Sequence, residues 1–107
     1  SLEGLTLLAE APDRRHVYNQ FVVTTQARDR LRDGLRDAAI GTEVYYPVPF
    51  HLQRCFADVP SARNEFPISS AAAAHSLAIP VYPELTEGMR HSVARRIASV
   101  LLKGPNR

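Results

Sequence analysis

The sequence predicts an α+β fold, in which a small sheet of about three strands packs with three to four helices. Apolar and polar side chains alternate through residues 16–25, which is the period of a strand. Apolar residues recur at helical spacing in residues 31–39 and again in residues 89–101. The succession of strand, helix, strand, helices, short strand and final helix is typical of an α+β sandwich, and it leaves the strand order open.

The first strand is expected over residues 16–25 and the first helix directly after it. Thr25 is a suitable N-cap because its hydroxyl can accept a hydrogen bond from the first turn of the helix. Leu31 and Leu35 then lie on one face of the helix. Gly41 follows the last apolar residues of this segment and suits a left-handed C-cap.

Two further features mark this helix. Asp29 with Arg32, and Asp33 with Arg36, stand three residues apart and form pairs on its exposed side. Gly34 lies inside it, at a cost of about 1 kcal/mol relative to alanine.

The middle of the chain is rich in proline. Residues 43–46 read as a second strand that stops at Pro47, because proline cannot donate a hydrogen bond to a sheet. Residues 52–57 read as a short helix, and residues 58–65 read as a polar loop.

The last third predicts a helix, a strand and a helix. Pro67 can occupy the first turn of a helix that runs to about residue 76, where its missing N–H has no intrahelical partner. Residues 77–82 read as a short strand, and Thr86 then caps the final helix. One apolar stripe of that helix holds Met89, Val93, Ile97, Val100 and Leu101. Gly104 and Pro105 are expected to end it.

Composition bounds the class of protein. The chain has 107 residues, enough for one domain, with a net charge of +2 and no dense basic stripe of the kind that binds nucleic acid. It contains no apolar run long enough for a membrane span and no visible signal peptide, so we expect a cytoplasmic protein. The first residue is not methionine, which indicates a piece of something longer. The single cysteine, Cys55, is expected to be a small buried apolar residue.

Several common site types are not indicated. The glycines form no GxGxxG or Walker pattern, so no phosphate-binding loop is encoded. Ser69 and Ser70 precede an alanine-rich helix and are expected to be residues of the helix start rather than nucleophiles. The histidines lack the spacing of metal ligands; they are His16, His51, His75 and His91.

The most unusual segment is Tyr-Tyr-Pro-Val-Pro-Phe-His at residues 45–51. Its two prolines stiffen a backbone that carries three aromatic rings and one imidazole. One interpretation is a proline-braced corner packed on the core. The other is a preorganised wall that presents a phenol and an imidazole to a ligand.

In this segment the chain resembles the C-terminal domain of the DegT/StrS-type sugar aminotransferases, which depend on pyridoxal phosphate (PLP). The resemblance covers residues 16–102. The matching pieces, in the family's order, are His-Val-Tyr-Asn-Gln-Phe-Val-Val at 16–23, Arg-Asp-Arg-Leu at 28–31, Ile-Gly-Thr at 40–42, Tyr-Tyr-Pro-Val-Pro-Phe-His-Leu-Gln at 45–53, Phe-Pro at 66–67 and Ile-Pro-Val-Tyr-Pro-Glu-Leu-Thr at 79–86.

The resemblance implies the small C-terminal domain of type I, aspartate aminotransferase-like, PLP enzymes. It implies a longer protein, called the parent below, that moves an amino group to a keto nucleotide sugar and works as a homodimer with active sites at the subunit interface. It places His51 near the substrate and Tyr46 close by. Many members have histidine where Tyr45 stands, which leaves the role of that position open.

Transamination by PLP needs a lysine amine, and the only lysine is Lys103 beside the C-terminal end. We therefore expect no catalytic residue and no cofactor-binding residue in this chain, whose partner would be the large PLP-binding domain of the same polypeptide. The expected organisation is a linker or N-terminal arm at 1–15, the small domain at 16–103 and a tail at 104–107. The alternative is a free-standing regulatory or interaction module with the same fold.

A domain taken from a larger assembly leaves its docking surface exposed. We expect such a surface, rich in apolar side chains, near residues 45–50.

Overall fold

The computed structural model describes residues 2–104 and contains one antiparallel sheet with helices on one of its faces. The strands are β1 (Thr6–Leu7), β2 (Phe21–Thr24) and β3 (Ser76–Ile79), in the order β1-β2-β3. β2 is central, and Val23 pairs with Leu7 on one side and with Leu77 on the other. The predicted α+β class with a small three-stranded sheet is therefore confirmed.

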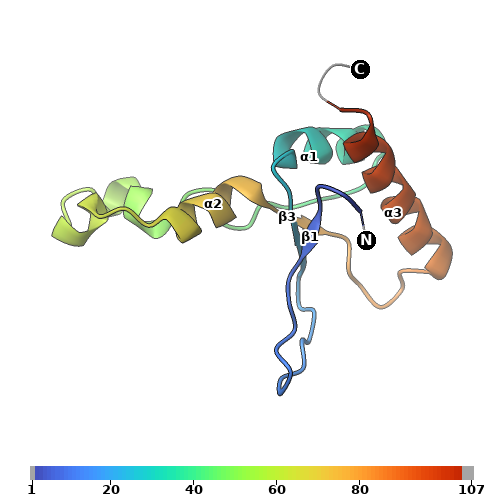
Figure 1. The fold of residues 1–107 in the computed structure, drawn as a ribbon, viewed down its shortest axis with the longest axis horizontal. Coiled ribbons are helices and arrows are strands. Elements are labelled where there is room, and N and C mark those ends of the chain that lie inside the picture. The colour runs from blue at the N-terminus through green and yellow to red at the C-terminus, as the bar shows by residue number, and fades with distance from the viewer. Residues whose placement is uncertain (1, 105–107) are drawn as a thin grey trace.

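The helices are α1 (Arg28–Asp37), α2 (Pro67–His75) and α3 (Glu87–Leu102), with short 3₁₀ turns at Phe50–Leu52, Arg54–Phe56 and Pro60–Arg63. In Figure 1, α1 and α3 lie together beside the sheet, whereas α2 and the 3₁₀ turns extend away from it. We call the sheet with α1 and α3 the body, and residues 45–75 the arm. The arm leaves the body after residue 44 and returns through α2 directly into β3.

The core is small and lies between the sheet and the two helices of the body. Its fully buried apolar residues are Val23 of β2, Leu77 of β3, Leu31 and Leu35 of α1, and Ile97 of α3. Side chains alternate along a strand, so Val23 and Leu77 face the helices while Val22 and Ala78 face the opposite side of the sheet. α1 and α3 lie away from that second side, which borders the arm instead.

Two predicted strands are wrong in extent. The strand predicted over residues 16–25 is confined to Phe21–Thr24, because Tyr18 adopts a left-handed conformation (φ 52°) that no strand can include. The strand predicted over 43–46 is reduced to one bridge between Glu43 and Ala78, since the chain then departs into the arm. The third strand of the sheet is instead β1, within the segment predicted as a linker or arm.

Both predicted caps of α1 are displaced. Thr25 stands two residues before the N-cap, Ala27, and its hydroxyl accepts the Ala27 N–H at 3.2 Å. At the other end, Ala39 rather than Gly41 takes the left-handed position, with φ 58°. The N–H of Ile40 reaches the Leu35 carbonyl and that of Ala39 reaches the Arg36 carbonyl, both at 2.9 Å, which is the Schellman pattern.

The C-terminal third follows its prediction closely. α2 begins at Pro67, and Thr86 caps α3 by accepting the Met89 N–H at 3.1 Å. Gly104 is left-handed (φ 58°) just beyond α3, while Pro105 and most of the predicted tail lie outside the described residues. The short helix predicted over 52–57 is two 3₁₀ turns, and a third turn occupies part of the predicted loop at 58–65. The division of the chain into linker, domain and tail stays a prediction.

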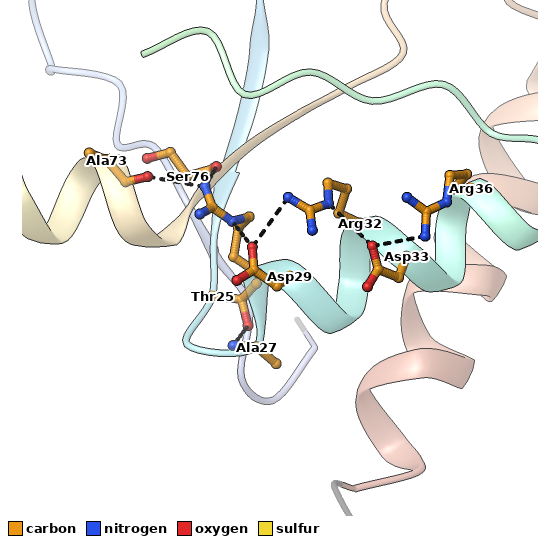
Figure 2. A network of polar contacts seen from close by, with 9 residues as sticks. Thr25, Ala27, Asp29, Arg32, Asp33, Arg36, Ala73 and Ser76 are labelled. Atoms are coloured by element: carbon orange, nitrogen blue, oxygen red, sulfur yellow. Dashed lines mark hydrogen bonds and ion pairs between the residues drawn. The ribbon is translucent and has the colours of Figure 1, made fainter. Parts of the chain in front are cut away.

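The arm is attached to the body at the C-terminal end of α2, where Arg28 is the main link. Its Nη1 donates to the Ala73 carbonyl at 3.0 Å and to the Ser76 carbonyl at 3.3 Å (Figure 2). The Thr25 N–H also donates to the His75 carbonyl at 3.0 Å. The last carbonyls of a helix have no partner within it, and a cation there is favoured by the helix dipole. Arg28 is 87% buried at this joint, since its side-chain exposure is 13%.

Arg28 also pairs with Asp29 at 2.7 Å, and the predicted pairs Asp29–Arg32 (3.4 Å) and Asp33–Arg36 (3.2 Å) continue the row along α1 (Figure 2). The hydrogen bond from Arg28, followed by its charge, holds the pKa of Asp29 below the ordinary carboxyl value, with Arg32 contributing less. These carboxylates are largely exposed, so they orient the arginines more than they stabilise the fold.

Gly34 is a point of close contact between α1 and α3. A Cβ added there would lie 2.5 Å from a methyl carbon of Val100, and Arg96 Nε donates to the Gly34 carbonyl at 3.1 Å. A methyl group would therefore force the two helices apart.

We predict that Gly34→Ala destabilises the fold by about 1–3 kcal/mol, because overpacking at the helix contact outweighs the gain in helix propensity. The matched control is Gly88→Ala in the first turn of α3, where the nearest neighbour of an added Cβ is the Thr86 hydroxyl oxygen at 3.9 Å. That variant should be neutral or more stable. Urea unfolding of the two variants gives the comparison, and a Gly34→Ala protein as stable as the unsubstituted chain contradicts this view of the contact.

We predict that Arg28→Ala lowers the free energy of unfolding by about 2 kcal/mol, because partly buried carbonyls at the C-terminal end of α2 lose charge-assisted hydrogen bonds. Arg28→Lys keeps the charge but not the forked donor and should recover only part of the loss. Arg32→Ala, on the exposed row, is the control and should cost no more than about 0.5 kcal/mol. Equal effects of Arg28→Ala and Arg32→Ala in denaturant titrations would show that the joint does not depend on Arg28.

Candidate functional site

The arm carries both predicted site residues. Pro47 and Pro49 favour an extended backbone in the first part of the arm. The 3₁₀ turns that follow lead the chain back to the N-terminal end of α2. Phe66 precedes α2, so it lies where the returning chain meets the first turn.

His51 is half-buried at a hollow of about 320 Å³ in the arm. Its imidazole packs against the Phe66 ring, with centroids 4.9 Å apart and planes inclined by 56°. Phe50 and Phe56 form a second aromatic pair, with centroids 5.8 Å apart. The hollow is lined by these four rings together with Val59, Ser61, Ala62 and Ser69. It therefore presents one titratable group in a mainly apolar setting.

Tyr46 lies elsewhere. Its side chain is 76% exposed and lines a different hollow, of about 390 Å³. This hollow lies between the arm and the side of the sheet opposite α1 and α3. Gln20, Val22 and Ala78 supply the sheet side of that hollow, and Ala72 and Ala73 of α2 supply another. Only Phe50 and Ser69 line both hollows. The structure does not bring Tyr46 and His51 into one hollow, and their assignment to a substrate site stays a prediction.

A third hollow is a groove of about 940 Å³ that shares Glu43 with the hollow beside Tyr46. It runs between the end of β3 and the first turns of α3, and its polar lining includes Asn19, Gln20 and Arg95. Sequence reasoning did not single out this groove, because its lining comes from four separated segments. Sequence reasoning also did not single out Phe66, which packs against His51, or Arg28, which binds the end of α2, although both stand in the motifs quoted for the family resemblance.

Lys103 lines neither of the two arm hollows and stands at the other end of the sequence from the segment at 45–51. It is the exposed C-cap residue of α3, and its hollow is shared with Arg30, Asp33, Asp37 and Arg96 of the body. None of the residues that line the two arm hollows is a lysine. The amine that a Schiff base with PLP requires is therefore not supplied by the residues that line these two hollows.

Other chemistry of the described residues is limited. Cys55 is exposed, so its predicted burial is wrong; it lies on a surface 3₁₀ turn with Sγ 3.8 Å from Gln53 Oε1. Within residues 2–104, no three side chains of His, Cys, Asp or Glu gather as a metal site. No helix in that range is both long and apolar enough to cross a membrane.

Comparison with known proteins agrees with this architecture. The chain is 37% identical over 102 residues to UDP-N-acetyl-3-dehydro-alpha-D-glucosamine 3-aminotransferase of Acidithiobacillus ferrooxidans, and covers 26% of it. It is 37% identical over 89 residues to a "pleiotropic regulatory protein" of Geobacillus stearothermophilus, and covers 24% of it. These alignments include 94% and 83% of this chain.

Among solved structures, Streptomyces venezuelae DesV in complex with a ketimine intermediate superposes with a TM-score of 0.85 and 32% identity. The match covers 92% of this chain and 26% of DesV. The chain thus spans about a quarter of the length of the relatives it matches. Residues 1–98 match the model of the DegT/DnrJ/EryC1/StrS aminotransferase family, and this chain belongs to that family.

Proposed function

We propose that this chain is the C-terminal small domain of a PLP-dependent aminotransferase that acts on keto nucleotide sugars, and that it is not catalytic alone. The observation that carries the proposal is its family membership combined with a span of only about a quarter of its relatives. The Acidithiobacillus relative is named for amino transfer to a UDP-linked dehydro sugar. The ketimine bound to DesV is an imine, the type of bond through which PLP chemistry moves nitrogen.

The shape of the chain supports a role within a larger assembly. Its accessible surface is 8328 Å², whereas a compact monomer of 11.9 kDa exposes roughly 6,000 Å². Its radius of gyration is 16.0 Å, against roughly 13 Å for a compact domain of this length. The excess comes from the projecting parts seen in Figure 1, which include the arm. We infer that the arm packs against the PLP-binding domain or the second subunit of the parent.

In the parent, we assign the Schiff-base lysine to the part of the polypeptide outside this chain. We assign His51 and Tyr46 to the substrate side of the active site. The Phe66 contact restrains the His51 ring, and an imidazole can orient a sugar hydroxyl or phosphate, or exchange a proton near neutral pH. Tyr46, being 76% exposed, is available to a ligand or to a neighbouring domain.

A second candidate function is a free-standing regulatory or interaction module. The regulatory name of the Geobacillus relative favours it, although the chain covers only 24% of that protein as well. The complete reading frame separates the two. A lysine-bearing cofactor domain upstream of residue 1 supports the aminotransferase, and a native start near residue 1 supports the module.

We predict that His51→Ala in the parent lowers turnover by roughly 10² or more, the scale expected for loss of an acid–base group, while the absorbance of bound PLP persists. His91→Ala is the matched control, because His91 is exposed on α3 with 68% of its side chain accessible. Steady-state kinetics and a visible spectrum of each variant provide the test. Unchanged turnover in His51→Ala removes this histidine from the site.

We predict that the isolated chain self-associates through the exposed apolar face at residues 45–50. Phe50 and Tyr46 expose 72% and 76% of their surface, and contiguous exposed apolar side chains favour association. Phe50→Ser should weaken association, whereas Leu102→Ser, on an equally exposed residue at the end of α3, should not. Light scattering over a range of concentrations reports the change, and a strict monomer at all of them contradicts the prediction.

A further inference from the structure

The connection between β1 and β2, residues 8–20, extends from the body in Figure 1 and is held by its own polar contacts. A turn at its tip is closed by the Arg14 N–H, which donates to the Ala11 carbonyl at 3.1 Å. Beyond the turn, Glu10 Oε2 accepts the His16 N–H at 2.8 Å. The connection is thus an ordered strap rather than an open loop.

Tyr18 is the strained point of this strap. Its φ of 52° lies in the left-handed region, which costs residues with a Cβ roughly 1–2 kcal/mol, and it carries a bulky ring. The Tyr18 N–H donates to His16 Nδ1 at 2.8 Å. A ring nitrogen that accepts a hydrogen bond carries no proton, so this contact requires a neutral imidazole protonated on Nε2.

The same residues form a stack of three rings. His16 and Tyr18 lie with centroids 4.1 Å apart and planes 25° from parallel, and Tyr18 and Phe21 lie 5.4 Å apart at 17°. Phe21 begins β2, packs against the core and lines the 940 Å³ groove together with Asn19 and Gln20. The conformation of Tyr18 therefore determines how the strap enters one wall of that groove.

We infer that His16 is a proton-controlled lock on this strap, a regulatory device independent of the proposed aminotransferase function. Protonation turns Nδ1 from an acceptor into a donor, so the Tyr18 N–H loses its partner and the left-handed conformation loses its support. The acidic group that faces His16 is Glu10, whereas Asp13 is paired with Arg14 at 2.9 Å and Arg15 is the adjacent cation. The lock is closed while the imidazole is neutral and opens when the imidazole takes up a proton.

Nuclear magnetic resonance of the 107-residue chain at pH 8 and pH 5, which bracket the usual histidine range, tests the lock. At pH 8 the nitrogen shifts of His16 should show the Nε2–H tautomer, and the Tyr18 coupling constant should report a positive φ. At pH 5 the Tyr18 amide protection factor, corrected for intrinsic exchange, should fall roughly fivefold, the effect of one hydrogen bond. An Nδ1–H tautomer at pH 8, or equal protection at both pH values, overturns the inference.

Three variants separate the lock from general stability. His16→Asn places an acceptor near the Nδ1 position but takes up no proton, so Tyr18 should stay protected at both pH values. His16→Ala should be unprotected at both. Glu10→Gln keeps an acceptor for the His16 N–H and removes the carboxylate, so Tyr18 should still lose protection at pH 5, because the proton that opens the lock is taken up by His16. A pH response of Tyr18 that persists in His16→Asn assigns the switch to another group and rejects the lock; the tautomer measurement needs no variant and decides the case if His16→Ala does not fold.

Discussion

The joint at the C-terminal end of α2 is the constraint on which the arrangement of the arm depends. The buried core contains five side chains, none of them from the arm, so apolar packing does not hold the arm in place. Hydrogen bonds do so instead: the carbonyls of Ala72, Ala73 and His75 receive N–H groups from Ser76, Arg28 and Thr25. Because α2 runs into β3 without a loop, ending the helix correctly also sets the start of the strand. The direction of α2 in turn determines the position of Phe66 at its N-terminal end, and so of the hollow beside His51.

The body solves a different problem, which is to make a stable unit from a small core. α1 and α3 approach so closely at Gly34 that a side chain on this residue would clash with Val100 of α3. This contact explains why a glycine with poor helix propensity stands in the middle of α1. It also brings Leu31, Leu35 and Ile97 over Val23 and Leu77, which closes one side of the sheet. The other side of the sheet borders the arm, and a hollow lies between them. A ligand or a neighbouring domain that enters this hollow would contact both the sheet and the arm.

Sequence patterns predicted the parts of the fold that local chemistry determines. Thr86 caps α3, and Leu31 and Leu35 are buried, because hydroxyl caps and helical spacing act within a few residues. The strand at 43–46 was wrong because pairing partners are set by tertiary structure, and here the chain turns away after one bridge. Ala39 took the left-handed position expected of Gly41 because the helix ends two residues earlier than the apolar pattern suggested.

The candidate site shows the same division between local and long-range information. The segment at 45–51 was recognisable from its prolines and rings, whereas the separation of Tyr46 from His51 follows from the 3₁₀ turns that fold the arm and from the sheet face opposite. The role of Arg28 depends on carbonyls 45 and 48 residues away, which no spacing rule connects. Two projections, the arm and the strap, are thus held largely by a few polar contacts rather than by the buried core. Such parts are expected at the low end of local stability in a domain, so the proposed assembly into a larger protein would draw on the segments of this chain that its own core secures least.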